Sequence, residues 1–141
     1  MKCGRADQPA TIDANVILRF LLDDPPDQAE RCQALLARLQ AGEEEVYLPE
    51  VVLSDVIWTL SSYYHWPRER ITRFAHDILS LKGTNMARPA LVRLALQVFV
   101  EQRIDYSDAL VVAEMIHGGY AEVYSFDRDF DQIEQVHRVE P

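Results

Sequence analysis

The pattern of apolar and polar positions predicts short strands that alternate with amphipathic helices. Some apolar runs are only a few residues long and are bounded by acids, prolines or glycines, whereas elsewhere apolar residues recur every three or four positions. The first pattern is typical of buried strands and the second of helices with one buried face. The predicted strands cover residues 9–13, 45–48, 84–86, 121–125 and 136–139.

The predicted helices begin and end at residues that suit those positions. The sequence 23–26 (Asp-Asp-Pro-Pro) stops the first helix because proline disfavours helical backbone in the residue before it. Gly42, Gly83 and Gly118 stand just after three later helices, where glycine is common. The predicted helices cover residues 15–22, 27–41, 51–64, 67–81, 89–102 and 106–117, and residues 126–133 hold a turn or a short helix.

This alternation predicts an α/β fold with a parallel sheet covered by helices. We expect residues 1–9 to form an N-terminal tail and residues 10–141 to form one domain, because the chain has no internal repeat and no long linker. Ligands of such folds bind where the strands reach their carboxyl ends. Asp13 closes the first predicted strand and Asp127 follows the fourth, so this edge of the sheet is the expected site.

Composition and charge restrict the class of protein. The 141 residues are 48% hydrophobic and 26% charged, as in an ordinary globular domain. The net charge of −9 argues against a protein that coats nucleic acid non-specifically, although an enzyme can still handle nucleic acid locally. The longest apolar run is Ala109 to Ala113, whereas a membrane span needs about 20 residues. We therefore expect a cytoplasmic protein without a membrane segment or a signal peptide.

Cysteine and histidine do not form a recognisable metal motif. Cys32 falls on an apolar helical stripe, which predicts a core position, and Cys3 lies in the expected tail. The four histidines share no short ligand spacing. Neither a zinc site nor a disulfide framework is predicted.

Three acids near the predicted strand ends each allow two interpretations. Asp13, or Asn15 beside it, would cap the helix that follows. Asp105 and Asp108 have the spacing of a capping pair, and Asp127 would cap the turn after the fourth strand. Taken singly, capping explains each acid as well as a functional site does.

Asp55 favours the functional interpretation. It lies inside a predicted helix that is apolar almost all round, and an ionised carboxylate buried alone there is costly. A salt bridge to arginine or a narrow solvent-facing strip would also explain it. We predict that Asp55 lines a polar pocket that contains a cation.

Four acids at one sheet edge would repel each other and raise their own pKa values unless a cation neutralised them. Hard divalent cations such as Mg²⁺ and Mn²⁺ prefer oxygen ligands. Two such ions stabilise both the attacking and the leaving oxygen of an in-line phosphoryl displacement. The predicted catalytic and metal-binding residues are Asp13, Asp55, Asp108 and Asp127.

Three segments of the chain carry a resemblance to a known family. They are residues 12–22 (Ile-Asp-Ala-Asn-Val-Ile-Leu-Arg-Phe-Leu-Leu), 106–111 (Tyr-Ser-Asp-Ala-Leu-Val) and 125–130 (Ser-Phe-Asp-Arg-Asp-Phe). In this order and spacing they resemble PIN-domain nucleases, above all the VapC-type toxins of type II toxin–antitoxin systems. The resemblance covers nearly the whole chain, from Ala10 to Val139.

The resemblance implies a three-layer α/β/α sandwich with a five-stranded parallel sheet. It also implies an endoribonuclease that hydrolyses RNA phosphodiesters with Mg²⁺ or Mn²⁺, forms a homodimer and is covered by a small antitoxin protein. By motif, Asp13, Asp108 and Asp127 match the first, third and fourth acids of the family. Asn15 matches the asparagine after the first acid, and Ser125 matches the small hydroxyl residue that would position a water or a carboxylate.

The second acid departs from the family's pattern, which usually has glutamate where this chain has Asp55. The side chain is one methylene shorter, which would weaken one metal or require a bridging water. Glu50 is a possible substitute, but it lies five residues earlier, about 140° round a helix. Two alternatives therefore stay open: a catalytically weakened PIN module that binds RNA or protein, and a housekeeping RNA-processing nuclease.

The chain lacks residues that other α/β classes require. Aspartyl-phosphate phosphatases need a second acid where Asn15 stands, and both they and receiver domains need a lysine deep in the fold, whereas the chain has only Lys2 and Lys82. Dinucleotide-binding domains need a glycine-rich turn after the first strand, where no glycine occurs. RNA contacts would come from arginines, and the candidates are Arg19, Arg68, Arg70 and Arg73. Nothing in the sequence places them at the site, and a solvated face is the favoured interpretation of each.

Overall fold

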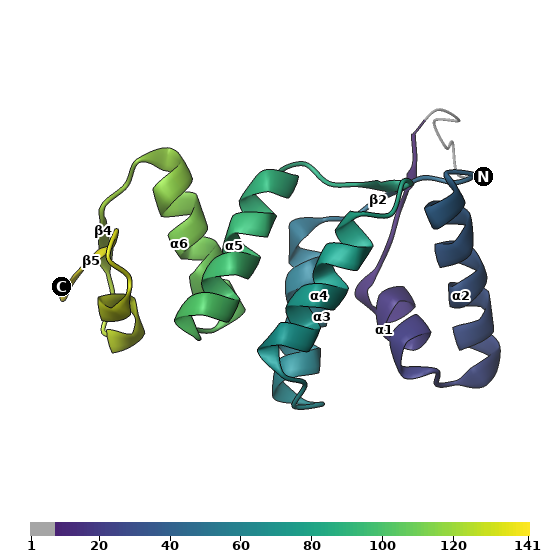
Figure 1. The fold of residues 1–141 in the computed structure, drawn as a ribbon, viewed down its shortest axis with the longest axis horizontal. Helices are drawn as coiled ribbons and strands as arrows, with labels where there is room; N and C mark the ends of the chain where they lie inside the picture. Colours follow the sequence, from purple (N-terminus) through teal and green to yellow (C-terminus); the bar gives the residue numbers. More distant parts are fainter. Residues whose placement is uncertain (1–7) are drawn as a thin grey trace. The chain divides into compact units, whose positions relative to one another are not determined.

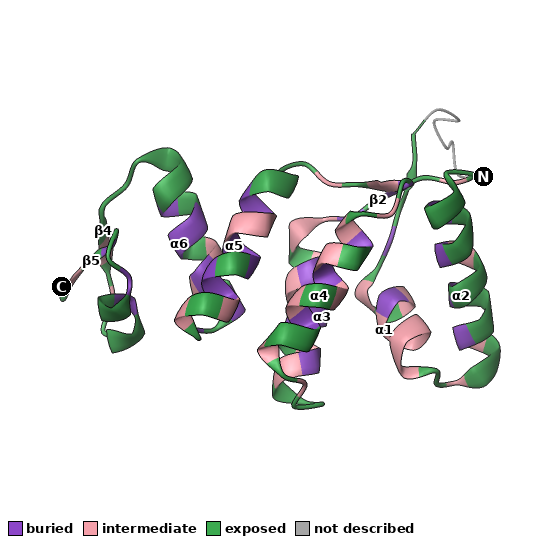
Figure 2. Ribbon diagram, viewed as in Figure 1, coloured by how far each residue is buried: buried purple, intermediate pink, exposed green. Residues whose placement is uncertain are grey.

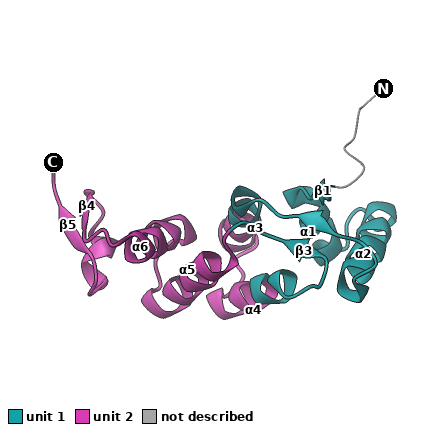
Figure 3. Cartoon of the chain, turned by 90° about the horizontal axis from the view of Figure 1, so that it is seen from above, with its two compact units in different colours: residues 1–56, 75–87 teal, residues 57–74, 88–141 magenta. Residues whose placement is uncertain are grey.

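The computed structural model describes residues 8–141 of the chain. These residues divide into two structural units, and Figure 3 shows unit 1 in teal and unit 2 in magenta. Of the described residues, unit 1 comprises 8–56 and 75–87, and unit 2 comprises 57–74 and 88–141. Most of the predicted tail, with Cys3, lies outside the described residues.

The elements follow one another in the order that the sequence predicts (Figure 1). Every predicted helix and strand is confirmed, with ends that differ by a few residues. The elements are β1 (Ala10–Thr11), α1 (Ala14–Leu22), α2 (Pro26–Ala41), β2 (Val46–Tyr47), α3 (Glu50–Ser62), α4 (Arg68–Leu79), β3 (Thr84–Asn85), α5 (Pro89–Gln102), α6 (Tyr106–Gly118), β4 (Glu122–Tyr124), η1 (Arg128–Gln132) and β5 (His137–Val139). The division between the two units falls within α3 and α4.

The five strands pair in two parallel sheets, of order β1-β2-β3 and β4-β5. The α/β class and the parallel pairing are confirmed, but the expectation of five strands in one sheet is wrong for this structure. One sheet would need backbone hydrogen bonds between the two sets of strands, and within residues 8–141 the ladders join only β1 with β2, β2 with β3, and β4 with β5. Apolar patterning predicts where a strand lies and says little about which strand it pairs with.

The three strands of unit 1 are in register at their carboxyl ends. Thr11 of β1 pairs with Tyr47 of β2, and Tyr47 pairs with Asn85 of β3. Val46 and Leu48 are buried while Tyr47 between them is exposed, which is the alternation expected of a strand. The segments that follow β1 and β2 therefore leave the sheet at the same edge.

Two glycines allow close backbone approach around β2. Gly42 ends α2 in the left-handed conformation, with φ of 76°, and its N–H bonds to the helix carbonyl of Leu39. Gly83 donates to the Leu39 carbonyl at 2.9 Å, and a Cβ atom there would collide with the carbonyl oxygen of Glu44. Only glycine fits at position 83 without a backbone shift.

Unit 2 is built on the packing of α5 against α6 and of η1 against β5. The rings of Phe99 and Tyr106 meet edge to face with their centroids 6.0 Å apart, and both residues are buried. Phe130 of η1 is also buried. The purple segments of Figure 2 mark these buried faces of the helices.

Two further expectations concern Cys32 and membrane segments. Cys32 is buried in α2, so its predicted core position is confirmed. None of the helices in the described part of the chain combines the length and the apolar character needed to cross a membrane.

Candidate functional site

Two of the predicted site acids come together in unit 2. Asp108 lies in the first turn of α6, and Asp127 is the N-cap residue of η1, three residues after the end of β4. Partial burial raises the pKa of Asp108, and the negative charge of nearby Asp127 raises it further. The fold thus places two carboxylates from separate segments close enough to repel each other.

The backbone around Asp127 is fixed by two hydrogen bonds between residues two apart in the sequence. The backbone N–H of Asp127 donates to the hydroxyl oxygen of Ser125 at 3.0 Å, and Oδ1 of Asp127 accepts from the N–H of Asp129 at 2.9 Å. The capping interpretation of Asp127 is therefore confirmed. Because the cap uses one carboxylate oxygen, it is compatible with a second ligand on the other. Ser125 therefore holds the backbone of Asp127 through its hydroxyl oxygen.

Arg138, which the sequence does not mark as a site residue, holds the end of β4 from the neighbouring strand. Its guanidinium is largely buried, donates to the carbonyl of Ser125 at 3.1 Å, and forms ion pairs of 2.9 Å with Asp131 and with Glu140. These hydrogen bonds raise the pKa of Arg138 and lower that of Asp131. A lone arginine in a short strand gives little sign of such a role in the sequence.

Two more acids, which were not predicted as site residues, act on Asp108. The charges of Asp105 and Asp129 both raise its pKa, after the larger effects of burial and Asp127. Asp105 is the N-cap residue of α6 but makes no side-chain hydrogen bond to the helix, so the capping-pair interpretation of Asp105 and Asp108 is not confirmed. In the sequence, Asp105 lies three residues before Asp108, and Asp129 lies two residues after Asp127. This close spacing of acids is the signal that could have identified them.

Asp13 lies at the carboxyl end of β1 in unit 1. Hydrogen bonding of the Ile12 N–H to the carbonyl of Tyr47, at 3.0 Å, keeps the backbone beside β2 up to this point. Asp13 occupies the N-cap position of α1 with extended backbone, yet its side chain makes no capping hydrogen bond. Asn15 follows in the first turn of α1 and is exposed. Capping therefore does not account for either polar side chain.

Asp55 is exposed, which agrees with the solvent-facing strip that the sequence also allowed, and its place in a cation-binding pocket stays a prediction. Leu53, Val56 and Ile57 form the buried face of α3, whereas Asp55 is exposed, as is Val51 one turn before it. Helix α3 therefore has an exposed stripe, and apart from Asp55 this stripe includes apolar residues such as Val51 and Trp58. For this reason the apolar composition of the helix did not reveal that one of its faces is exposed. Asp55 lies five residues after Glu50, the first residue of α3, and this spacing corresponds to about 7.5 Å along the helix axis.

The four predicted acids thus fall into two pairs. Asp13 and Asp55 belong to unit 1, and Asp108 and Asp127 belong to unit 2. Within the described residues, no group of three or more histidine, cysteine or acidic side chains lies close enough together to hold a metal ion. The donors in unit 2 are all carboxylate oxygens, and Mg²⁺ commonly binds one or two carboxylates and completes its shell with water and phosphate oxygens. The pair Asp108 and Asp127 fits this kind of ion.

Comparison with known proteins places the chain in a family. A profile of the PIN domain matches residues 10–136. The chain belongs to the PIN-domain family. The match includes all four predicted acids of this PIN domain, and it confirms the resemblance seen in the sequence.

A curated relative points in the same direction. The PIN-domain chain is 25% identical over 122 residues to a protein named VapC ribonuclease from Aquifex aeolicus (strain VF5), covering 86% of this chain and 90% of the relative. The similarity therefore spans nearly the full length of both proteins and is not confined to one motif.

Proposed function

We propose that this PIN-domain protein is a divalent-metal-dependent endoribonuclease and the toxin of a toxin–antitoxin pair. The support is its family, together with a full-length similarity to a protein named VapC ribonuclease. In this proposal, residues 10–141 act as one domain in the cytoplasm, as a homodimer, and a small antitoxin protein covers the site.

The observation that carries the proposal is the carboxylate pair of Asp108 and Asp127. The segments 106–111 and 125–130 carry two of the family's motifs, and the fold brings these two acids close enough for one to raise the pKa of the other. Such repulsion is unfavourable without a cation, so the arrangement suits a site made to hold one.

We assign metal binding to Asp13, Asp55, Asp108 and Asp127, with Mg²⁺ or Mn²⁺ as the ion. When bound, such an ion lowers the pKa of a water and stabilises charge on the leaving oxygen of a phosphodiester. Asp108 supplies a negative oxygen at the start of α6, and Asp127 supplies one at the start of η1. Ser125 holds the backbone of Asp127, and Asn15 is assigned to orient groups around Asp13.

The test is cleavage of a mixed pool of structured RNA, tRNA included, with Mg²⁺, Mn²⁺ or EDTA. We expect cutting that needs the metal and falls by at least about a hundredfold in Asp13→Asn and Asp108→Asn, because each change removes a charged oxygen ligand. Asp77→Asn, an exposed acid of α4, is the matched control and should cut like the wild type. Equal cutting with EDTA, or by the two site variants, would contradict the proposal.

A second candidate function is a weakened PIN module that binds RNA or protein without cutting. It is favoured by Asp55, which replaces the usual glutamate of the family and is exposed on α3. The Asp55→Glu variant separates the two candidates. Cutting that appears only in Asp55→Glu would identify a weakened site, whereas cutting by the wild type identifies an active nuclease.

A further inference from the structure

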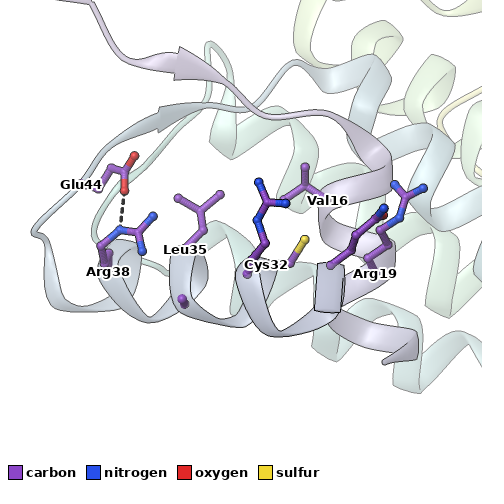
Figure 4. Close-up of a pocket in the computed structure, with 9 residues that line it drawn as sticks. Val16, Arg19, Cys32, Leu35, Arg38 and Glu44 are labelled. Atoms are coloured by element: carbon purple, nitrogen blue, oxygen red, sulfur yellow. Dashed lines mark hydrogen bonds and ion pairs between the residues drawn. The ribbon is translucent and has the colours of Figure 1, made fainter. Parts of the chain in front are cut away.

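Helices α1 and α2 of unit 1 form a groove lined by three arginines. Its volume is about 630 Å³. Figure 4 shows Arg19 of α1 at one end of the groove, Arg38 of α2 at the other, and the side chains of Cys32 and Leu35 between them. Arg31 lines the same groove from α2.

The charges in this groove are unbalanced. Arg38 forms an ion pair of 2.7 Å with Glu44, which also lines the groove. Across the part of the chain that the structure describes, neither Arg19 nor Arg31 forms a salt bridge or a side-chain hydrogen bond. The remaining polar lining residue is the amide side chain of Gln28. The groove therefore carries two positive charges that form no ion pair within the described residues, in a chain whose net charge is −9.

We propose that this groove binds the phosphate backbone of single-stranded RNA next to the scissile bond. Arginine presents a planar fork of donors that matches phosphate oxygens, and it holds its charge at every physiological pH. A nuclease with a net charge of −9 needs a local positive path for its substrate, and Arg19 and Arg31 supply one. The proposal rests on the proposed function, because it names where that substrate lies.

The position of the groove relative to Asp13 supports this assignment. Asp13 is the N-cap residue of α1, and Arg19 lies six residues later, about 9 Å along the same helix. One strand of RNA that enters the groove thus has its neighbouring nucleotides within reach of a predicted site acid. The apolar floor formed by Val16, Cys32 and Leu35 offers no acceptor that would repel phosphate.

The experiment is RNA binding measured by fluorescence anisotropy with a labelled single-stranded RNA over a range of salt. All proteins carry Asp108→Asn to prevent cutting and are measured in Mg²⁺. We compare the parent with a groove variant, Arg19→Gln with Arg31→Gln, and with a control, Arg73→Gln with Lys82→Gln. Arg73 and Lys82 are exposed and lie outside the groove, so both double variants lose two positive charges.

We expect the groove variant to bind RNA at least about tenfold more weakly at low salt. Removal of one arginine–phosphate interaction should reduce the slope of log K against log salt by about 0.7, so the slope should fall by about 1.4 for the pair. Arg19→Lys with Arg31→Lys should keep the slope, since it keeps both charges, and bind more weakly than the parent because the planar forks are absent. The control should match the parent.

A second measurement needs no groove substitution, so it holds even if the groove variant fails to fold. RNA should protect Arg19 and Arg31 of the Asp108→Asn protein from modification by phenylglyoxal, mapped by mass spectrometry, and should leave Arg73 reactive. Unprotected groove arginines, equal weakening in the control, or an Asp108→Asn protein that binds no RNA would each overturn the proposal.

The outcomes also separate the groove from the nuclease activity. Cutting by the wild type together with unchanged RNA binding by the groove variant would overturn the groove and leave the proposed function standing. A labelled poly-glutamate peptide tests the other anionic partner. If Arg19 and Arg31 were needed for peptide binding but not for RNA binding, the groove would be assigned to an acidic protein segment instead.

Discussion

At the scale of single residues, Asp108 is the carboxylate of unit 2 that several neighbouring acids repel. Its carboxylate is partly buried and faces the charges of Asp127, Asp105 and Asp129. The folded chain holds a proton on Asp108 more tightly than the unfolded chain does, because the same charges are separated on unfolding. The metal-free protein is therefore destabilised by ionised Asp108 at neutral pH.

Asp108→Asn should stabilise the metal-free protein at pH 7. Since the pKa of Asp108 is raised on folding, its stabilising contribution is complete below the unfolded pKa of about 3.9 and is lost as pH rises through the folded pKa. After a discount for solvent exposure we expect a gain of about 0.5 kcal/mol, near 2 °C in Tm. Thermal unfolding in EDTA from pH 3.5 to pH 7 should show this gain shrink as the pH falls.

Asp27→Asn is the matched control for this measurement. Asp27 also stands in the first turn of a helix, α2, so the substitution removes the same interaction with the helix dipole. It should be neutral or slightly destabilising. A loss of stability in Asp108→Asn as large as in Asp27→Asn would mean that the helix dipole outweighs the repulsion among the acids.

Ser125 acts at the same scale through one hydrogen bond. Ser125→Ala removes the acceptor for the Asp127 N–H, and we expect metal affinity to fall about tenfold, as on loss of other groups that orient a ligand. Stability should fall by less than about 1 kcal/mol, because solvent can reach the exposed Asp127. Ser125→Thr keeps the hydroxyl and should bind Mn²⁺ like the wild type in a titration. Wild-type affinity in Ser125→Ala would exclude this role for the hydroxyl.

At the scale of elements, Arg68 joins the first turn of α4 to the end of α5. Its Nη1 donates to the carbonyl of Phe99 at 3.1 Å and also to the carbonyl of Ile104, and its guanidinium lies 4.6 Å from the centre of the Phe99 ring. The last carbonyls of a helix lack partners within the helix, so a charged donor there is favourable. Ile104 directly precedes Asp105 and the start of α6, so this interaction also fixes the approach to Asp108.

Arg68→Ala should therefore lower the free energy of unfolding by about 2–4 kcal/mol, because it removes two charge-assisted hydrogen bonds and the cation–π interaction with Phe99. Arg70→Ala is the control, because Arg70 is exposed and its guanidinium lies over the Trp66 ring, 3.5 Å from the ring centre. It should cost about 1 kcal/mol or less. Urea unfolding measures both, and equal losses in the two variants would contradict the assigned role of Arg68.

At the scale of the whole molecule, the acidic composition links folding to cations. A net charge of −9 destabilises a folded chain through self-repulsion, and the acids around Asp108 concentrate part of that repulsion. A divalent cation that binds only the folded state stabilises it by mass action.

Mg²⁺ or Mn²⁺ should raise Tm, and EDTA should reverse the change. At a hundredfold excess over Kd, the gain in the free energy of unfolding should be about 2.7 kcal/mol. Differential scanning fluorimetry in each ion measures this, and Asp108→Asn should lose most of the gain while Asp77→Asn keeps it. A Tm that does not respond to either ion, or an equal response in Asp108→Asn, would contradict the proposal that a metal ion binds at Asp108.

The amino-acid sequence by itself determined the order and type of the elements. Periodic apolar positions, prolines such as Pro25 and Pro26, and glycines such as Gly42 act over a few residues, so they specify helices and strands locally. The motifs around Asp13, Asp108 and Asp127 were also enough to place the chain in the PIN-domain family. These signals need no knowledge of the rest of the fold.

Only the tertiary structure decided the pairing of strands, the exposure of Asp55 and the surroundings of Asp108. The strands pair as β1-β2-β3 and β4-β5, which depends on hydrogen bonds between segments far apart in the chain. Asp55 is exposed because α3 buries its opposite face, and an apolar exposed stripe cannot be told from a buried one by composition. The meeting of Asp108 with Asp127 depends on where α6 begins and where β4 ends, since charges interact through space and not along the sequence.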